Sequence, residues 1–417
     1  MPRRSILTLA GRALSRKRPW PAMWRHPSAR KSYEVVIIGG GGHGLATAYY
    51  LARRHGIRDI AVVERGVIGF GNVGRNTTIV RSNYLHYPAN RFLEHSLKLW
   101  EGLERELNYN VMVSQRGVLN LAHSDGQMES MARRGNAMLI AGIDAVLLDR
   151  DEVRRMVPGF DFDNPRFPIY GGLLQRRGGT VRHDAVAWGY ASAADRLGVD
   201  ILQTCEVQGI RIAGGRVAGV ETSGGFIAAG KVLLACAGNS SRVAAMAGLE
   251  LPIETHLLQA YVTEAIQPLI DQVITYGAGH FYVSQSDKGG LVFGGYYDGY
   301  TSYTQRGAFA RIEDVAVEAL SVFPNLGRLR LLRSWAGNVD LTMDGSPVAG
   351  RTGIEGLYLN AGWGGSGFKA TPAAGWCLAQ TIAEDRPHPL IAPFSIDRFR
   401  SGDLVNEAGT GAQPNLH

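Results

Sequence analysis

Cysteine, charge and long apolar runs are all scarce in this chain of 417 residues. The 3 cysteines have neither the even number of a disulfide framework nor the spacing of a metal site, which fits a reducing cytoplasm. No apolar stretch approaches the length that crosses a membrane, and the run at 231–238 is far too short. We therefore expect a cytoplasmic protein without a membrane span.

Acidic residues are absent from residues 1–31, which hold nine Lys and Arg side chains. Removing these nine charges from the net charge of +7 leaves −2 for the remainder, so the basic pI belongs to this N-terminal arm. A nucleic-acid surface over the body is therefore not expected. The arm lacks the apolar segment of a secretion signal. Its residues Trp20 and Trp24 leave two alternatives open, an arm that docks on a partner and a disordered tail.

Glycine, by contrast, is abundant, and one group of glycines follows a predicted buried strand at 35–38. Gly39, Gly41 and Gly44 precede a helical pattern, and Glu64 ends the next strand, twenty residues after Gly44. In a dinucleotide-binding fold these glycines allow a tight turn, close approach of a pyrophosphate and close helix–strand packing, while the acid binds a ribose. The acid disfavours a 2′-phosphate, so the pattern predicts FAD or NAD rather than NADP.

A lone histidine, His183, stands in the stretch "GGTVRHDAVAW" between a glycine turn and an expected helix. Asp184 is the expected N-cap of that helix, which Gly198 ends. A lone histidine most often packs or caps locally. Neither a metal-ligand cluster nor a Ser-His-Asp constellation is evident anywhere in the chain.

Four stretches, taken in order, resemble one family: "VVIIGGGGHGLATAYYL", "GRNTTIVRSNYL", "QRRGGTVRHDAVAW" and "GWGGSGFKATP". Together they resemble the β subunits of heterotetrameric sarcosine oxidases. The similarity is more distant to the monomeric sarcosine and glycine oxidases of the D-amino-acid-oxidase-like flavoprotein group. It covers nearly the whole chain, from about residue 19 to about residue 405.

The resemblance implies oxidative demethylation of sarcosine at a noncovalent FAD. Electrons would pass to an FMN attached covalently to His183 and then to O2, giving H2O2, glycine and formaldehyde or methylene-tetrahydrofolate. The implied partners are an α subunit that carries NAD and folate, and small γ and δ subunits. Two alternatives stay open: a stand-alone FAD-dependent amine or imino-acid dehydrogenase of dimethylglycine, proline or opine type, and a flavin-binding assembly subunit without turnover.

The implied fold is α/β (α+β overall), a Rossmann-like FAD-binding domain with an interleaved antiparallel β-rich substrate domain. Separated segments are expected to build each domain, since strand-rich regions alternate with glycine turns and helical patterns. One of these regions, at 279–295, is expected to form a hairpin. The expected division is an arm at 1–31, an FAD-binding domain at 32–100, 178–255 and 335–400, a substrate and interface domain at 101–177 and 256–334, and a tail at 401–417.

Arg81 and Lys369 match the residues that hold the substrate carboxylate in related amine oxidases. Arginine offers a planar fork and lysine a compact charge. The alternatives are a structural salt bridge for Arg81 and a solvated cation for Lys369, and the matched lysine also lies close to FMN. The expected FAD contacts are Gly39, Gly41, Gly42, His43 and Gly44 at the pyrophosphate, Glu64 at the ribose, Asn72, Arg75, Asn76, Thr77 and Ile79 under the flavin, Val207 and Gly238 near the adenine, and Gly364 and Gly367 near the pyrimidine.

Two departures from the monomeric oxidases bear on the cofactors. Those enzymes bind FAD through a cysteine near the position of Gly337, where this chain has none, so noncovalent FAD is expected. An approximate alignment places Phe293 at the lysine that activates oxygen in those enzymes. That replacement suggests a reaction of oxygen elsewhere, at FMN. Val207 has a plain core valine as its alternative interpretation.

Overall fold

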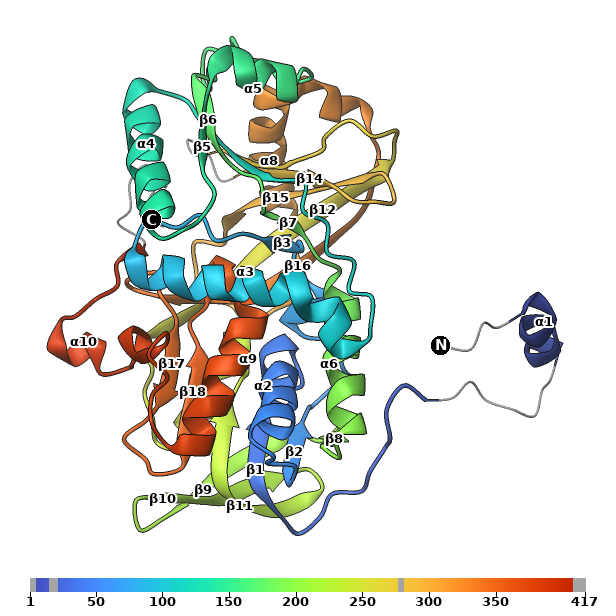
Figure 1. Ribbon diagram of the computed structural model, residues 1–417, viewed down its shortest axis with the longest axis vertical. Coiled ribbons are helices and arrows are strands. Elements are labelled where there is room, and N and C mark those ends of the chain that lie inside the picture. Colours follow the sequence, from blue (N-terminus) through green and yellow to red (C-terminus); the bar gives the residue numbers. More distant parts are fainter. Residues whose placement is uncertain (1–4, 15–21, 277–280, 408–417) are drawn as a thin grey trace.

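The computed structural model describes residues 5–14, 22–276 and 281–407. Two eight-stranded sheets form its body, one below the other in Figure 1. We call the lower sheet the nucleotide sheet and the upper one the second sheet, and each contains strands from widely separated parts of the sequence. This arrangement agrees with the expected mixed α/β class.

The nucleotide sheet has the strand order β17-β18-β11-β1-β2-β8, and the hairpin β9–β10 extends from β11. Its central strands are parallel, as the apolar run at 35–38 predicts, because a parallel strand is buried on both faces. The bounds are β1 Ser32–Ile38, β2 Ile60–Val63, β8 Asp200–Leu202, β9 Val207–Ala213, β10 Arg216–Thr222, β11 Gly225–Leu234, β17 Val348–Arg351 and β18 Leu357–Ala361.

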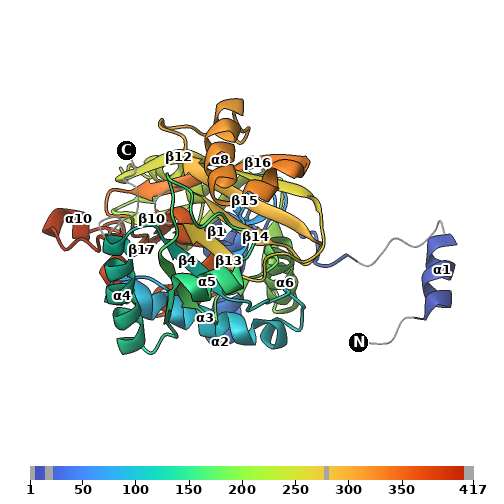
Figure 2. The same ribbon diagram turned by 90° about the horizontal axis from the view of Figure 1, so that it is seen from above.

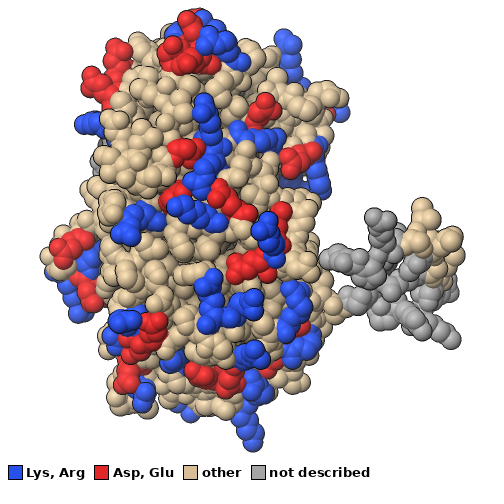
Figure 3. All heavy atoms as spheres, viewed as in Figure 1, with Lys and Arg blue, Asp and Glu red and all other residues tan. Residues whose placement is uncertain are grey.

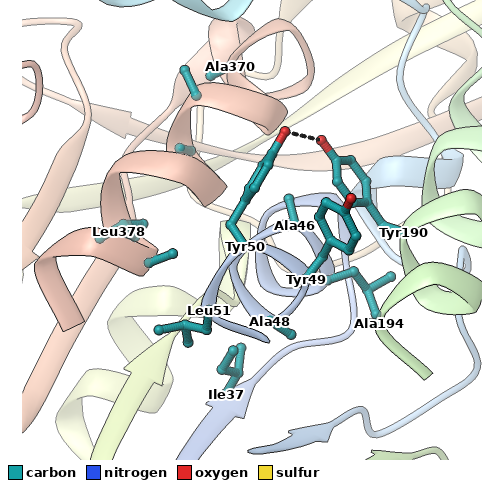
Figure 4. Close-up of a cluster of buried hydrophobic side chains, with 14 of the residues drawn as sticks. Ile37, Ala46, Ala48, Tyr49, Tyr50, Leu51, Tyr190, Ala194, Ala370 and Leu378 are labelled. Atoms are coloured by element: carbon teal, nitrogen blue, oxygen red, sulfur yellow. Dashed lines mark hydrogen bonds between the residues drawn. The ribbon is translucent and has the colours of Figure 1, made fainter. Parts of the chain in front are cut away.

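Four helices, α2, α3, α6 and α9, pack together on one side of this sheet. Figure 4 shows the core between α2, α6 and α9, where the hydroxyl groups of Tyr50 and Tyr190 lie 3.5 Å apart. Gly375 of α9 lies directly against Ala46 of α2, which lets the two helix backbones approach closely. The bounds are α2 Gly42–Arg54, α3 Tyr87–Leu107, α6 His183–Arg196 and α9 Gly367–Glu384.

The second sheet has the order β16-β12-β15-β14-β13-β4-β6-β5. The antiparallel pair β14–β15 confirms the hairpin that the sequence predicts near 279–295, of which residues 277–280 lie outside the described part. The bounds are β4 Val118–Ala122, β5 Val146–Asp149, β6 Gly171–Gln175, β12 Ile253–Ala265, β13 Val273–Tyr276, β14 Tyr282–Gln285, β15 Gly290–Tyr297 and β16 Leu331–Thr342.

Helices α4 and α5 contact β5 and β6, whereas α8 contacts β15. Figure 2, seen from above, shows α8 well apart from α4 and α5. The strands β12 and β16 cross the expected domain boundaries at 255 and 335, so the division into two domains stays a prediction. The remaining elements are α1 Ile6–Leu14, β3 Ile79–Val80, α4 Asp125–Ile140, α5 Arg150–Met156, β7 Gly179–Thr180, α7 Ser240–Ala245, α8 Phe309–Val322 and α10 Arg398–Ser401, and the short 3₁₀ turns Asn72–Gly74, Ala237–Asn239, Pro324–Arg328, Gly364–Ser366 and Ala392–Phe394.

The N-terminal arm has two parts in the described residues. Helix α1 lies away from the body in Figure 1, while residues 22–31 run along the nucleotide sheet. Arg25 forms an ion pair with Asp195 at 2.8 Å, and Arg30 bonds Asp200 at 3.2 Å. Trp24 packs against the core, whereas Trp20 lies outside the described residues. Lys, Arg, Asp and Glu side chains intermingle on the face shown in Figure 3. Across the described ranges, we find no helix long and apolar enough to span a membrane.

One predicted helix start is wrong. Arg182, not Asp184, is the N-cap of α6, and the helix begins at His183. The Asp184 carboxylate instead accepts bonds from the Arg182 guanidinium at 2.7 and 2.9 Å and from the backbone N–H of Ala185 at 2.8 Å. A bidentate ion pair with the neighbouring arginine outweighs capping here.

Candidate active site

A cavity of about 640 Å³ extends from the start of α2 to the strands of the second sheet. Almost all predicted FAD and substrate residues line it, although they come from both ends of the chain; Gly44 and His183 do not. The predicted residues in its wall are Gly39, Gly41, Gly42, His43, Glu64, Asn72, Arg75, Asn76, Thr77, Ile79, Arg81, Val207, Gly238, Gly364, Gly367 and Lys369. Their individual roles stay predictions.

At one end of the cavity, the glycine turn joins β1 to α2. Gly39 has a φ of +112°, a conformation that favours glycine, and a Cβ on Gly44 would overlap the Gly39 carbonyl. Gly44 therefore serves helix–strand packing rather than lining the cavity. The Glu64 carboxylate accepts the backbone N–H groups of Gly40 and Gly66, at 2.9 and 2.8 Å. The N-terminus of α2 faces a space suited to a pyrophosphate.

Both ring nitrogens of His43 are engaged with other residues of the protein rather than with the pyrophosphate space. Its Nε2 lies 2.6 Å from the Gly367 carbonyl oxygen, and its Nδ1 lies 3.0 Å from the Asn360 side-chain oxygen. Burial lowers the pKa of His43, whereas its hydrogen bonds with Gly367 and Asn360 raise it. The side chain joins the starts of α2 and α9, which leaves only its backbone N–H for a phosphate.

The loop at 72–79 is held against β16 by its own polar groups. Asn72 exchanges bonds with the backbone of Asn338, and Trp335 donates to the Arg75 carbonyl at 2.6 Å. Asn76 bonds the backbone within its own turn, where Thr78 has a φ of 70°. The two asparagine side chains thus shape the loop, and its backbone forms the cavity wall.

A buried carboxylate lies under the glycine turn at 362–364. Asp340 of β16 is 3% exposed and accepts the Gly362 N–H at 2.6 Å. Burial raises the pKa of Asp340 to about 6, although backbone hydrogen bonds from the turn lower it. The carboxylate fixes this turn, whose Gly364 lines the cavity. Gly364 and Gly367 thus lie where a flavin pyrimidine could meet backbone N–H groups.

Arg81 and Lys369 meet in the same cavity. Lys369 is 5% exposed, and its Nζ donates to the Gly365 carbonyl at 2.7 Å. Burial, together with the Arg81 charge, lowers the pKa of Lys369 well below its usual range. Its backbone carbonyl accepts the indole N–H of Trp100 and the hydroxyl of Ser96, both from α3. Two basic side chains that line one cavity form a suitable site for a carboxylate.

Buried polar groups hold the loop that carries Arg81. The guanidinium donates to the Asn83 side-chain oxygen at 2.5 Å, and Asn83 donates to Asn120. Ser82 is bonded to Gln175 of β6 and to Glu94 of α3. Ser82, Asn83 and Gln175 are fully buried. Because every one of these side chains has a partner, the network fixes the loop rather than weakening it.

His183 does not line the cavity and is the first residue of α6, three residues after β7. The backbone of β7 pairs with β3, and the N–H of Val181 donates to the Thr78 carbonyl at 3.0 Å. The His183 Nδ1 is buried without a hydrogen-bond partner among the described residues, and burial lowers the pKa of the imidazole. The His183 side chain is 28% exposed. A neutral, partly accessible imidazole is chemically able to act as a nucleophile.

The sequence analysis missed several residues that line the cavity. They come from the second sheet and from α4, and no sequence motif marks them. For α4, the helical periodicity is the one signal that could have indicated which side of the helix lines the cavity. The missed residues include Asn120, Arg134, Thr275, Tyr282, Tyr297 and Asp340. Gly337 lines the cavity beside Asn72, as expected for a residue near the flavin. Phe293 instead packs on Tyr261 in the core, so it carries no argument about oxygen.

Comparison with known proteins supplies the family. The FAD dependent oxidoreductase family, DAO, matches residues 34–381. The chain belongs to this family. Within it, this oxidoreductase is 62% identical over 415 residues to the sarcosine oxidase subunit beta of Rhizobium meliloti (strain 1021), with 100% of both chains covered. It is 50% identical over 391 residues to that of Arthrobacter sp, with 94% of this chain and 96% of the relative covered. The chain thus groups with the sarcosine oxidase beta subunits.

Solved structures agree with this FAD-dependent oxidoreductase fold. L-proline dehydrogenase from P. horikoshii superposes with a TM-score of 0.84 at 27% identity and covers 90% of this chain and 100% of its own. Glycine oxidase from Geobacillus kaustophilus gives a TM-score of 0.80 at 23% identity, with 88% and 99% covered. The predicted fold class is therefore confirmed.

Proposed function

We propose that this chain is the β subunit of a sarcosine oxidase complex and oxidises sarcosine at a noncovalent FAD. The observation that carries the proposal is the meeting of Arg81 and Lys369 in the cavity that the FAD-binding residues also line. The 62% identity to a sarcosine oxidase subunit beta supports the same substrate. FAD, when bound, supplies the acceptor for the two electrons that leave the substrate.

The protein's own task is to bind and orient the substrate. Arg81 and Lys369 bind the carboxylate, and the rigid loop at 81–83 fixes the direction of the guanidinium. A carboxylate in this site raises the pKa of the Lys369 ammonium and favours its charged form. The walls formed by Tyr282 and Tyr297 reduce the access of water to the methyl group.

In this proposal His183 would hold an FMN covalently, and that flavin would supply the acceptor for electrons from FAD and the place where O2 is reduced to H2O2. The lowered pKa of the imidazole supports its nucleophilic role. His183 follows β7, which pairs with β3 at the end of the cavity loop 72–79. This neighbourhood supports a short path between the two flavins. The proposed partners are an α subunit that carries NAD and folate, and γ and δ subunits that complete the assembly. The folate site of the α subunit would take up the one-carbon product.

Intact mass spectrometry tests the attachment. The chain is co-expressed with candidate partner subunits and analysed under denaturing conditions. We expect an added mass equal to FMN less the two hydrogen atoms lost when the C–N bond forms. This mass should disappear in His183→Ala and persist in His26→Ala, because His26 is exposed and does not line the cavity. Loss of all flavin from the denatured wild-type chain would contradict covalent attachment.

Anaerobic mixing with sarcosine tests the reaction itself. We expect sarcosine to bleach the flavin absorbance. In Arg81→Gln, the sarcosine concentration that gives half of this bleaching should rise by at least ten-fold. A stand-alone imino-acid dehydrogenase would instead release all its flavin on denaturation and respond to proline rather than sarcosine. An assembly subunit without turnover would bleach with neither.

A further inference from the structure

The hydrogen-bond partners of the His43 ring indicate its protonation state, to which the proposed function gives no role. His43 lies in the first turn of α2 and lines the cavity. Its Nε2 lies 2.6 Å from the Gly367 carbonyl oxygen, which can only accept a hydrogen bond. The Nε2 atom therefore carries a proton. Whether Nδ1 also carries one depends on its neighbour, the Asn360 side chain.

The Asn360 side chain presents its oxygen to His43. The indole N–H of Trp363 donates to the Asn360 Oδ1 at 2.5 Å. If the amide were turned over, its NH2 group would meet that indole N–H, and two donors would face each other. The His43 Nδ1, 3.0 Å from the same oxygen, therefore also faces an acceptor. An amide oxygen has two lone pairs, so it can accept from both neighbours.

A histidine ring whose nitrogens both face acceptors is satisfied as the imidazolium, because the neutral ring has a single N–H group. Burial opposes this positive charge and lowers the pKa of His43, whereas the two hydrogen bonds raise it. The first turn of α2 is also the positive end of the helix dipole, which repels a cation. An anion in the cavity would compensate both effects.

The nearby ionisable side chains are bonded elsewhere. The Glu64 carboxylate accepts the Gly40 N–H of the turn before α2, and the Asp340 carboxylate accepts an N–H of the turn at 362–364. Lys369, in the first turn of α9, donates to a backbone carbonyl. The influences on the pKa of His43 are burial and its own two hydrogen bonds. A ligand is therefore the suitable source of the compensating anion.

The amide that orients the ring has a donor left for such a ligand. Asn360 is 2% exposed and lines the cavity. Its Nδ2 is buried and has no hydrogen-bond partner among the described residues. A buried N–H group without an acceptor is unfavourable, and a ligand oxygen would satisfy it. The dianionic pyrophosphate of FAD supplies both negative charge and acceptor oxygens.

We propose that His43 is an imidazolium in the FAD-loaded protein, that its positive charge stabilises the FAD pyrophosphate, and that FAD binding therefore takes up a proton at His43. The inference rests on the proposed function in one respect, namely that FAD is bound without a covalent bond. An anion beside the imidazole raises its pKa. By linkage, FAD should bind more weakly as the pH rises toward the pKa of His43 in the loaded protein.

Equilibrium dialysis of the FAD-loaded complex at several pH values tests this coupling. Free and bound FAD are measured from about pH 6 to about pH 9, on both sides of the ordinary histidine pKa. We expect the Kd of FAD to rise by up to about ten-fold per pH unit, the limit for one linked proton. In His43→Gln, which keeps a donor but cannot be protonated, Kd should be nearly independent of pH. His55→Gln, at the other end of α2, should keep the pH dependence of the wild type.

Asn360→Asp gives a second route if His43→Gln does not fold. It places a carboxylate at the His43 Nδ1, which should raise the pKa of the imidazole and move the pH dependence of Kd to higher pH. Equal weakening of FAD binding at every pH in this variant would overturn the inference. A wild-type Kd that does not change with pH, or the same pH dependence in His43→Gln, would also overturn it. The measurement needs no sarcosine, so its failure is distinguishable from a wrong substrate.

Discussion

Arg81 owes the direction of its guanidinium to Asn83, a fully buried side chain between the two sheets. Asn83 in turn donates to Asn120, and Asn120 donates to the Thr275 hydroxyl, both at 2.5 Å. This series of bonds crosses from the Arg81 loop to β13. The carboxylate site therefore depends on a side chain that the substrate itself need not touch.

Asn83→Ala should weaken substrate binding more than turnover. The variant removes a hydrogen bond to a charged group, for which about 1.5–3 kcal/mol is typical. We expect KM for sarcosine to rise about ten-fold, which corresponds to about 1.4 kcal/mol, with a smaller change in kcat. Steady-state kinetics measure both constants, and Asn325→Ala, at an exposed position, is the control. A fall in kcat at constant KM would show that Asn83 acts differently.

Lys369 should couple carboxylate binding to proton uptake. Its pKa is lowered in the free site by burial and by Arg81, and an anionic ligand raises it again. Between those two pKa values, binding of acetate should take up a proton. Calorimetry in buffers of different ionisation enthalpy measures that uptake. It should vanish in Lys369→Met, and uptake unchanged in the variant would assign the proton to another group.

At the scale of elements, the packing of α2 on α9 sets the position of Lys369 relative to the phosphate turn. The phosphate turn is the glycine turn at 39–41 that precedes α2, and Lys369 lies in the first turn of α9. A Cβ on Gly375 would lie 2.5 Å from the Ala46 Cβ and 2.7 Å from the Ala46 backbone carbon. Neither neighbour is a flexible side chain that can move away. The spacing of these helices therefore sets the distance between the two ends of the flavin site.

Gly375→Ala should separate α2 from α9. Overpacking of this kind typically costs about 1–3 kcal/mol of unfolding free energy. We expect a loss in that range by denaturant unfolding, together with weaker FAD retention. Gly126→Ala in α4 is the matched control, because nothing lies within 4 Å of its added Cβ. Equal stability of the two variants would mean that the helices adjust without cost.

The sequence predicts the elements better than the contacts between them. The strand at 35–38, the glycine turn and the hairpin at 279–295 follow from local patterns, and the structure has all three. Three features depend on contacts between separate segments of the sequence. They are the hydrogen bond from Asn83 to Asn120, the bond of the Asp340 carboxylate with the turn at 362–364, and the place of Arg134 in the cavity wall. No local pattern records such contacts. The prediction that Asp184 caps α6 is wrong because the neighbouring Arg182 guanidinium binds its carboxylate.

At the scale of the whole molecule, a buried ion pair fastens the C-terminal segment. Arg398 of α10 donates to both oxygens of Asp344, at 2.8 and 2.9 Å, and both side chains are nearly inaccessible. Asp344 also accepts the N–H of Val405 at 3.2 Å. The pair therefore positions the segment around Glu407, whose carboxylate accepts the backbone N–H of His86 at 3.1 Å.

Arg398→Met should be strongly destabilising, because it leaves the Asp344 carboxylate buried without its partner. Removal of one member of a buried pair typically costs about 3–5 kcal/mol. Arg216→Met removes an ion pair with Glu355 whose members are 61% and 58% exposed, and it should cost less than about 1 kcal/mol. Thermal or denaturant unfolding compares the two. Similar losses would contradict a special role for the buried pair.

The cavity wall is completed by residues that stand more than 300 positions apart, from Gly39 to Lys369. A ribosome therefore releases α9 more than 300 residues after the phosphate turn. Until α9 has emerged and packed on α2, the nascent polypeptide has an incomplete cavity wall, and flavin capture has to wait for that step.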